Sequence, residues 1–500
     1  MASTRNILLI FELYQKAKLN FLQGIYDYTL KKEVNFQQLL DLNIMTQVIP
    51  LLTDGASNVQ NLAIVTTVKL SAGCQAIAEY ILQRNVLSCL GNEFEQQPKD
   101  YRRNVLQIVK HISKYSALTE ELLNQGKHLL TSSIDELDNV QRELVLSTLT
   151  QIANHSICNA HQVMNLHVLH HVISCLQVPI NLSLEATQLV KALSKHSEDI
   201  ARSLVEHNIL SYLGENLNSD DPKIIKQTFL CFSEISKHSI EFAEKVMSTS
   251  ALCKAIFHTS HSDNNVRRSA AVLLRELCKH SVDISRSVVQ HGALAGLFSL
   301  IDDTNSMVKL PAAKTLGHMG SQSEHLALHI IHSQGLPVLI KALNNESNET
   351  CLSSIVWALE SLTKHSVQHV HYLNDSNVFA KLLRIYISSE SSPDLKCRCL
   401  SFLRSTIDKC FNIQDIELLL YESPPEILLP ALKQLCKILA QDVKARRVFV
   451  STNGLKRVQA LKPPAGSELS EAVTIINSYF PEDIVRYFSP RNSTGVSEKV

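Results

Sequence analysis

Apolar residues recur at spacings of three and four along most of this chain, which is the period of an α-helix. Residues 270–278 are an example, with the sequence Ala-Ala-Val-Leu-Leu-Arg-Glu-Leu-Cys. The strict alternation of apolar and polar residues that marks a β-strand is absent. Gly and Pro each occur only 14 times in 500 residues, and such scarcity favours long helices joined by short turns. The pattern therefore predicts an all-α protein.

A recurring tripeptide divides this helical pattern into units. Lys-His-Ser or a degenerate copy of it ends at a series of positions that lie 40 to 43 residues apart, namely 116, 156, 197, 239, 281, 323 and 366. A period near 42 is typical of armadillo and HEAT repeats, and WD40 propellers share it. The chain has a single Trp and no Gly-His or Trp-Asp punctuation, which argues against a propeller. We therefore predict a right-handed α-solenoid of armadillo repeats with helical caps.

The chemistry of the tripeptide suits a corner between two helices. Lys and His are favourable at a helix C-terminus, where the macrodipole is negative. Ser is a preferred N-cap of the helix that follows, as at Ser197, which is followed by Glu198 and Asp199. The row of Lys-His pairs is interpreted as structural. The alternative interpretation is that these pairs also contact a partner protein.

Four segments follow from where the period holds. Residues 1–40 are expected to form an N-terminal helical cap, with Phe11, Tyr14, Ala17 and Phe21 along one face. Residues 41–410 are expected to hold about eight or nine armadillo repeats of about 42 residues. Residues 411–489 are expected to form a C-terminal helical cap, and the polar tail 490–500 is expected to be disordered.

Charge and composition exclude several classes of function. Lys+Arg and Asp+Glu both number 48, so the formal net charge is zero, and the basic surplus of a general nucleic-acid binder is missing. No apolar run approaches the roughly 20 residues that cross a bilayer, so neither a nucleic acid nor a membrane is expected as a partner. Twelve scattered cysteines indicate buried thiols in a reducing compartment.

A partner is expected on the concave surface that a solenoid builds from its third helices. The candidate positions lie nine and five residues before each corner serine, where armadillo proteins that carry nuclear cargo show a ladder of Trp and Asn. Only Trp357 fits that ladder, and it is interpreted first as a packed aromatic residue and second as a recognition platform. Glu234 and Glu276 suggest an acidic middle for a basic partner, or else a solvated face. The candidate surface is Gln107, His111, Ser147, Gln151, Gln188, Leu230, Glu234, Val272, Glu276, Lys314, His318, Trp357 and Ser361.

Candidate catalytic and metal chemistry is weak. His325, His329 and His332 would share a helical face, but the Glu of a metalloprotease motif is missing, and His167 with His170 or His171 repeats the idea on a smaller scale. Cys397 and Cys399 are two residues apart, which a helix directs to nearly opposite sides. No catalytic residue, cofactor or metal site is therefore expected, and the chain is predicted not to be an enzyme.

Several blocks of sequence outside the tripeptide are also distinctive, namely residues 11–18, 421–425, 444–450, 454–459 and 481–490. Together with the Lys-His-Ser corners, they resemble one family nearly end to end, the sperm-associated antigen six armadillo proteins of the axonemal central apparatus. The turns of the repeats depart from the family pattern, which indicates a diverged orthologue or paralogue.

The resemblance implies a non-catalytic structural scaffold that supports flagellar and sperm motility. The implied partners are central-apparatus proteins and microtubules, self-association is compatible with the family, and the implied location is the cytoplasm, cytoskeleton and axoneme of the cilium or flagellum. The alternative is a soluble armadillo adaptor that binds an extended peptide in transport or signalling.

Overall fold

The computed structural model describes residues 2–31, 33–92, 94–131, 137–178, 180–373, 377–421 and 423–489. These residues form α-helices and short 3-10 helices, and no strand occurs among them. The predicted all-α class is confirmed. The predicted disordered tail, 490–500, lies outside the described residues.

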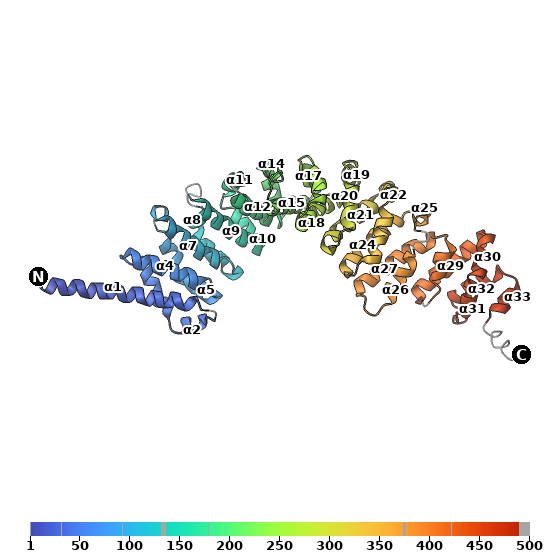
Figure 1. The fold of residues 1–500 in the computed structure, drawn as a ribbon, viewed down its shortest axis with the longest axis horizontal. Helices are drawn as coiled ribbons and strands as arrows, with labels where there is room; N and C mark the ends of the chain where they lie inside the picture. Colours follow the sequence, from blue (N-terminus) through green and yellow to red (C-terminus); the bar gives the residue numbers. More distant parts are fainter. Residues whose placement is uncertain are drawn as a thin grey trace. The chain divides into compact units, whose positions relative to one another are not determined.

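The chain divides into two compact units, Met1–Phe242 and Ala243–Val500, and α16 (Ile240–Met247) contains the division. The long helices of the first unit follow one another in Figure 1. Its helices are α1 (Ala2–Thr29), α2 (Phe36–Asp41), α3 (Ile44–Val48), α4 (Ser57–Ser71), α5 (Gln75–Gln83), α6 (Val86–Leu90), α7 (Lys99–Ile112), α8 (Thr119–Thr131), α9 (Asn139–His155), α10 (Ile157–Met164), α11 (Leu169–Leu176), α12 (Ile180–Ser194), α13 (Glu198–Glu206), α14 (Ile209–Asn216) and α15 (Pro222–Ser236).

The second unit continues the same order of helices. It comprises α17 (Ala251–Phe257), α18 (Asn264–Cys278), α19 (Val282–Gln290), α20 (Ala293–Ile301), α21 (Ser306–Gln322), α22 (Glu324–His332), α23 (Gly335–Asn345), α24 (Glu349–Thr363), α25 (Val367–His371), α26 (Val378–Ile387), α27 (Pro393–Thr406), α28 (Ile413–Leu418), α29 (Pro425–Gln441), α30 (Val443–Ser451), α31 (Gly454–Ala460), α32 (Glu468–Ser478) and α33 (Glu482–Phe488).

Two shorter helices and one long helix make up most repeats, as in α13, α14 and α15 or α19, α20 and α21. This is the armadillo plan that the period predicts. Consecutive long third helices pack on one another within each unit, as α9 does on α12 and α21 on α24. Just past residue 410 only one short α-helix, α28, precedes the long α29, and the three-helix plan resumes with α30, α31 and α32.

The third helices begin at polar caps that the sequence supplies locally. Asp138 and Gln141 form a reciprocal capping box at the start of α9. Asp221 caps α15, which has Pro222 in its first turn, and Asn348 caps α24. Pro is favourable there because the first helical N–H groups have no partner within the helix.

The corner serines cap the first helices of most repeats, as predicted. Ser197 Oγ accepts from Ile200 N at 3.2 Å, and the serines at 156, 239 and 281 make the equivalent bond. Three corners differ. Ser116 begins a 3-10 helix and makes no such cap, Ser323 makes none either, and Ser366 Oγ instead lies 2.7 Å from His369 Nδ1.

A residue with left-handed backbone joins the first and second helix of several repeats. It is Asn208 in one repeat, with φ of 58°, and Gly292 in another, with φ of 84°. The turn at 334–335 has a glycine but does not use it in this way, because Gln334 and not Gly335 has the positive φ, at 73°. Asn and Gly tolerate this region best, since other side chains clash there with the backbone.

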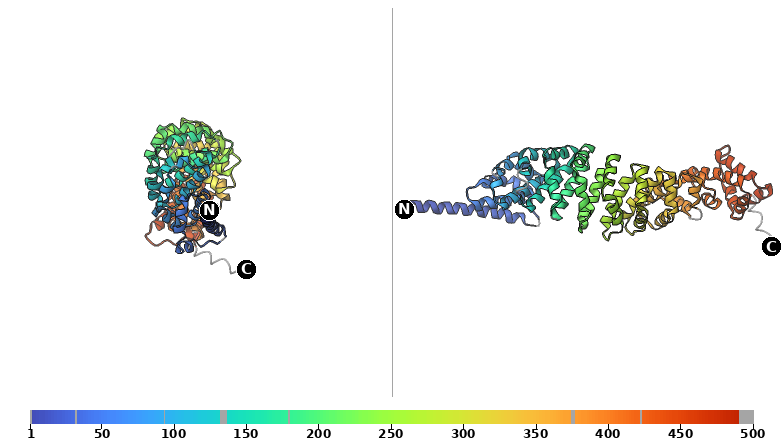
Figure 2. Two further views of the ribbon diagram at one scale, coloured as in Figure 1. Left: turned by 90° about the vertical axis from the view of Figure 1, so that its left-hand side faces the viewer. Right: turned by 90° about the horizontal axis from the view of Figure 1, so that it is seen from above.

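The N-terminal helix α1 does not pack through the predicted face. Phe11 and Tyr14 are 56% and 59% exposed, and the contact with the first repeat is made further along, where Leu22 is fully buried. Lys18 Nζ lies 2.6 Å from Asp54 Oδ2 at the same contact. The right-hand view of Figure 2 shows that the first part of α1 extends away from the other helices of its unit. The predicted apolar residues thus share one side of α1, but that side is exposed, because helical periodicity identifies an apolar face and not its partner.

All twelve cysteines are free thiols. Cys231 and Cys278 are fully buried in the core, and burial raises the pKa of the Cys278 thiol to about 12. Cys89 and Cys253, in contrast, are exposed. The prediction of buried thiols thus holds for part of the set.

Among the described residues, no single helix is long and apolar enough to cross a membrane. Helices α22 and α23 satisfy that length and composition only when taken together, and the chain bends by 76° between them.

Candidate functional site: the exposed face of the third helices

The structure places every candidate residue on a third helix. In the first unit, α7, α9, α12 and α15 carry them, and in the second unit α18, α21 and α24 carry the rest. All residues nine positions before a corner serine are half-buried. Those five positions before it are half-buried too, except Ser361, which is 1% exposed, and Ala192, which is buried as well. Ser361 therefore cannot contact a partner through its side chain.

His111 and Gln151 are partly used in contacts between repeats. His111 Nδ1 lies 3.1 Å from the Val68 carbonyl oxygen and 3.0 Å from Ser71 Oγ. Ser113 Oγ donates to Gln151 Oε1 at 2.7 Å. Both side chains lock one third helix against the next, so their place on the exposed face is in part structural.

Positive charge surrounds His111. Burial is the main cause that lowers its pKa, and the ammonium groups of Lys114, Lys110 and Lys69 lower it further. These lysines belong to α4, α7 and the corner that follows α7. Two neighbouring repeats thus bring three cations around one imidazole.

The glutamates of the proposed acidic middle are both paired with cations. Glu234 forms an ion pair with Lys237 in the first unit. In the second unit, Glu276 pairs with Arg275 and lies 3.7 Å from Lys279 Nζ. Each carboxylate thus already has a cation from its own helix or corner, and the acidic middle stays a prediction.

Trp357 packs against the preceding third helix. Its ring lies edge-on to His318, with the ring centroids 5.0 Å apart, and it covers Gly317 so closely that an added Cβ would lie 2.4 Å from Trp357 Cζ3. The indole is half-buried. These contacts favour the packed-aromatic reading, and Gly317 is the residue that makes room for the ring.

Three of the corner histidines bond to the preceding repeat, whereas His196 Nε2 is buried without a hydrogen-bond partner among the described residues. His155 Nε2 lies 2.7 Å from the Ser113 carbonyl oxygen and His238 Nε2 lies 2.6 Å from that of Ser194. In the second unit, His365 Nε2 lies 2.6 Å from the Gly320 carbonyl oxygen. The last carbonyls of a helix have no partner within it, so each histidine satisfies one of them from the next repeat. This supports the structural reading of the tripeptide.

Gln322 performs the same task where the corner histidine is replaced. Its Nε2 donates to the Cys278 carbonyl oxygen at 2.8 Å. The side-chain N–H of a glutamine can therefore take the place of the histidine at this corner. The sequence suggested that histidine stabilises its own helix, and the bond to the neighbouring helix could not be recognised from local spacing.

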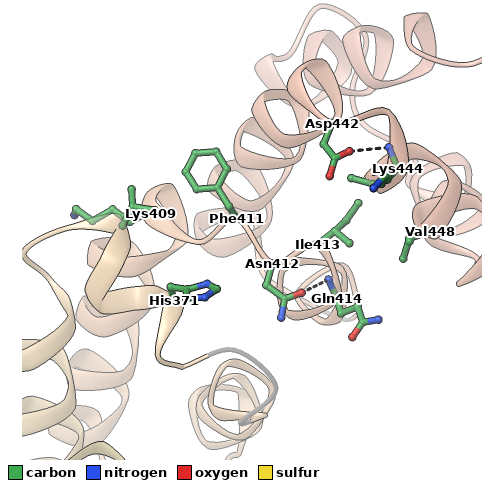
Figure 3. A pocket seen from close by; sticks show the side chains of 11 residues that line it. His371, Lys409, Phe411, Asn412, Ile413, Gln414, Asp442, Lys444 and Val448 are labelled. Atoms are coloured by element: carbon green, nitrogen blue, oxygen red, sulfur yellow. Dashed lines mark hydrogen bonds between the residues drawn. The ribbon is translucent and has the colours of Figure 1, made fainter. Parts of the chain in front are cut away.

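A cavity lies elsewhere in the second unit, along the corners near residues 371, 411 and 442 (Figure 3). Its volume is about 550 Å³. Two of its polar groups cap helices: Asp442 Oδ1 accepts from Lys444 N at 2.7 Å, and Asn412 Oδ1 accepts from Gln414 N at 3.1 Å. It is lined by Val367, His371, Lys409, Phe411, Asn412, Ile413, Gln414, Asp442, Lys444, Ala445 and Val448.

The candidate metal groups do not come together. His325, His329 and His332 are exposed on α22, and no group of three or more His, Cys, Asp or Glu within the described ranges could hold a metal ion. His167 has a left-handed backbone, with φ of 54°, and precedes α11. It therefore does not share a helical face with His170 or His171, as the spacing had suggested.

No protein-family model matches the chain. It is similar to human sperm-associated antigen 6, with 37% identity over 164 residues, and to the mouse protein of that name at the same identity and length. The match covers 33% of this chain and 32% of each relative. The similarity thus spans about a third of the length of these curated relatives.

Solved structures support the fold alone. An engineered protein superposes with a TM-score of 0.66 over 87% of this chain and 98% of its own, at 14% identity. A designed armadillo repeat protein matches 47% of this chain and 98% of its own, with a TM-score of 0.44 and 18% identity, and this weaker likeness adds nothing to the argument. The chain is thus an armadillo-repeat solenoid that resembles sperm-associated antigen 6, as a diverged relative, across about a third of its length.

Proposed function

We propose that this protein is a non-catalytic scaffold of the axonemal central apparatus in cilia or flagella, where it supports motility by holding other proteins near a microtubule. The observation that carries the proposal is the similarity to sperm-associated antigen 6. The residues that we assign to partner contact are those that stay accessible on the third helices, since a solenoid offers its partners this continuous surface.

The architecture is consistent with such a role. Each third helix buries one side against its neighbours, as Leu273 and Leu277 of α18 do at 0% exposure. The opposite side keeps half-buried polar residues such as Gln107 and Gln188. The cavity near Asn412 offers no comparable case for catalysis, because its Asp442 and Asn412 oxygens already cap helices and a catalytic site needs free groups in mutual reach.

Localisation of the full chain tests the proposal. A tagged copy expressed in flagellated cells should remain with the axoneme after detergent extraction, and the tag alone should be released. Cryo-electron tomography of axonemes with and without the protein should then differ along a central microtubule. A tagged chain that is released completely by detergent, with no change in the central pair, would refute the scaffold.

The same detergent extraction distinguishes the alternative, a soluble adaptor that binds a peptide. It predicts that the chain leaves the axoneme with the detergent-soluble fraction and carries one partner at a stoichiometric level. A chain retained on axonemes lacking any central pair would contradict the assignment to the central apparatus in particular.

A further inference from the structure

The exposed face of the third helices in the first unit differs in charge from the rest of that unit. We define the third-helix face as the residues two, five, six, nine, twelve and thirteen positions before each corner serine, or before Cys74 for α4. Helical geometry places these positions on one side. On α4, α7, α9, α12 and α15 the face carries eight cations and three glutamates: Lys69, Arg103, Lys110, Lys114, Lys191, Lys195, Lys226 and Lys237, with Glu143, Glu185 and Glu234.

This face is basic although its unit is acidic. Residues 1–242 contain 20 Lys and Arg and 24 Asp and Glu, a net charge of −4. The third-helix face within them has a net charge of +5, from eight cations against three glutamates. All eleven charged side chains on it are exposed or half-buried. The positive charge is therefore collected on one surface and available to solvent.

Most of these cations have no carboxylate at ion-pair distance among the described residues. Lys237 is the exception, because it pairs with Glu234, while Lys191 Nζ donates to the amide oxygen Gln227 Oε1 at 3.2 Å. Glu185 acts on Lys110 electrostatically, but from beyond ion-pair distance. The seven without a carboxylate at ion-pair distance are Lys69, Arg103, Lys110, Lys114, Lys191, Lys195 and Lys226.

The unpaired cations also lie near one another. Lys69, Lys110 and Lys114 all act on the imidazole of His111, and α4 packs directly on α7. Like charges in one place repel, and without a bound anion this arrangement costs stability. A ligand that supplies negative charge would relieve that repulsion.

We propose that the third-helix face of the first unit binds an acidic, extended segment of a partner protein. Packed helices lie about 8–10 Å apart and an extended chain advances about 3.3 Å per residue, so each repeat meets roughly three residues. Five third helices span about 12 residues of such a segment. A carboxylate at every second or third position would then lie within reach of a cation on each repeat.

A peptide fits this surface better than a nucleic acid does. Nucleic-acid binding relies on neutralising many phosphates and is favoured by a basic domain, whereas residues 1–242 have a net charge of −4. The acidic remainder of the unit repels a long polyanion, while a short acidic segment can follow the basic face alone. The inference deepens the proposed function, because it assigns partner chemistry to the same surface.

The test measures binding of a labelled peptide to the full chain. A fluorescein-labelled peptide of about 12 residues that alternates Glu and Ser is titrated with the protein and followed by fluorescence anisotropy. A peptide with Gln in place of Glu and a single-stranded oligothymidylate of equal length serve as comparison ligands. The protein variant K69E/K110E/K114E reverses the cluster around His111.

A matched variant controls for overall charge. K16E/K31E/K127E makes the same change in net charge at exposed lysines of the first unit that lie outside the third helices. A neutral variant, K69Q/K110Q/K114Q, serves if the reversal fails to fold by circular dichroism. Titrations at low and physiological ionic strength add an independent readout, since salt screens exposed charges.

We expect the Glu-Ser peptide to bind and to weaken with salt. The variant at the face should lose at least tenfold in affinity, the neutral variant should lose affinity as well, and the matched control should change less than threefold. Equal losses in face and control variants, no binding of the Glu-Ser peptide, or equal binding of the Gln-Ser peptide or the oligothymidylate would overturn the inference. The proposed function is tested separately, since a chain retained on axonemes without binding this peptide refutes only the acidic ligand.

Discussion

The bond from a corner histidine to the preceding repeat gives the sharpest prediction of stability. His365 Nε2 lies 2.6 Å from the carbonyl oxygen of Gly320, near the end of α21. Replacing His365 with Leu keeps much of the apolar volume but removes the donor. Replacing it with Gln keeps an N–H donor, as Gln322 does at the corner one repeat earlier.

The size of the destabilisation follows from the loss of the hydrogen-bond donor to the Gly320 carbonyl oxygen. A buried acceptor left without its partner costs about 1–3 kcal/mol, whereas an intact bond contributes about 0.5–1.5 kcal/mol net. Gly320 is buried, so water cannot readily replace the donor. We therefore expect His365→Leu to destabilise the protein by about 2 kcal/mol and His365→Gln to cost less than about 1 kcal/mol.

Chemical unfolding and amide hydrogen exchange together measure the loss of stability in the two His365 variants. Repeat arrays unfold in parts, so exchange of the amides near the end of α21 should accelerate in His365→Leu and stay close to wild type in His365→Gln. His325→Leu is the control, because His325 is exposed on α22 and surface substitutions usually stay within about 0.5 kcal/mol. Equal destabilisation by Leu and Gln would refute the role of the donor.

Three further perturbations follow from single contacts. Gln334→Gly should stabilise the protein by about 1 kcal/mol in chemical unfolding, because Gln334 has a φ of 73° and glycine adopts that region without strain. Gly317→Ala should destabilise by about 1–3 kcal/mol and shift the fluorescence of Trp357, the chain's one Trp, because the new Cβ would lie 2.4 Å from the indole. Glu346 lies 3.0 Å from Lys309 Nζ, and although burial opposes it, hydrogen bonds from Asn348 N and from Lys309 help lower its pKa from 4.5 to about 2. The stability that this depressed pKa contributes is present above pH 4.5 and is lost as the pH falls towards about 2. The Glu346→Gln protein should therefore unfold at a lower temperature than wild type near neutral pH, and its unfolding temperature should fall less on acidification.

Each of these has a control within the chain. Ser333→Gly changes the residue before Gln334, where φ is −79°, and it should not stabilise. Gly24→Ala adds a Cβ that meets nothing within 4 Å, and it should not destabilise. Asp283→Gln removes an exposed carboxylate and should leave the acid profile unchanged. The reasoning fails if any control variant shows the same effect as the test variant with which it is matched.

Local chemistry made much of the architecture predictable from the sequence. The 42-residue period, the helical spacing of apolar residues and the caps at positions such as Ser197 and Asp221 all act within a few residues of one another. They determine that helices form, where they begin and how they repeat. The weak catalytic and metal motifs could also be judged from spacing, except for His167, whose left-handed backbone interrupts the expected helix.

Contacts between repeats were decided only by the tertiary structure. The sequence could not show that Phe11 is exposed, that Ser361 is buried, that Glu234 pairs with Lys237, or that His238 bonds to the previous repeat. Partners about 40 residues apart meet only after successive repeats stack, and burial depends on that stacking. The basic face arises in the same way, because lysines that are scattered in a chain of zero net charge become neighbours once the third helices lie side by side.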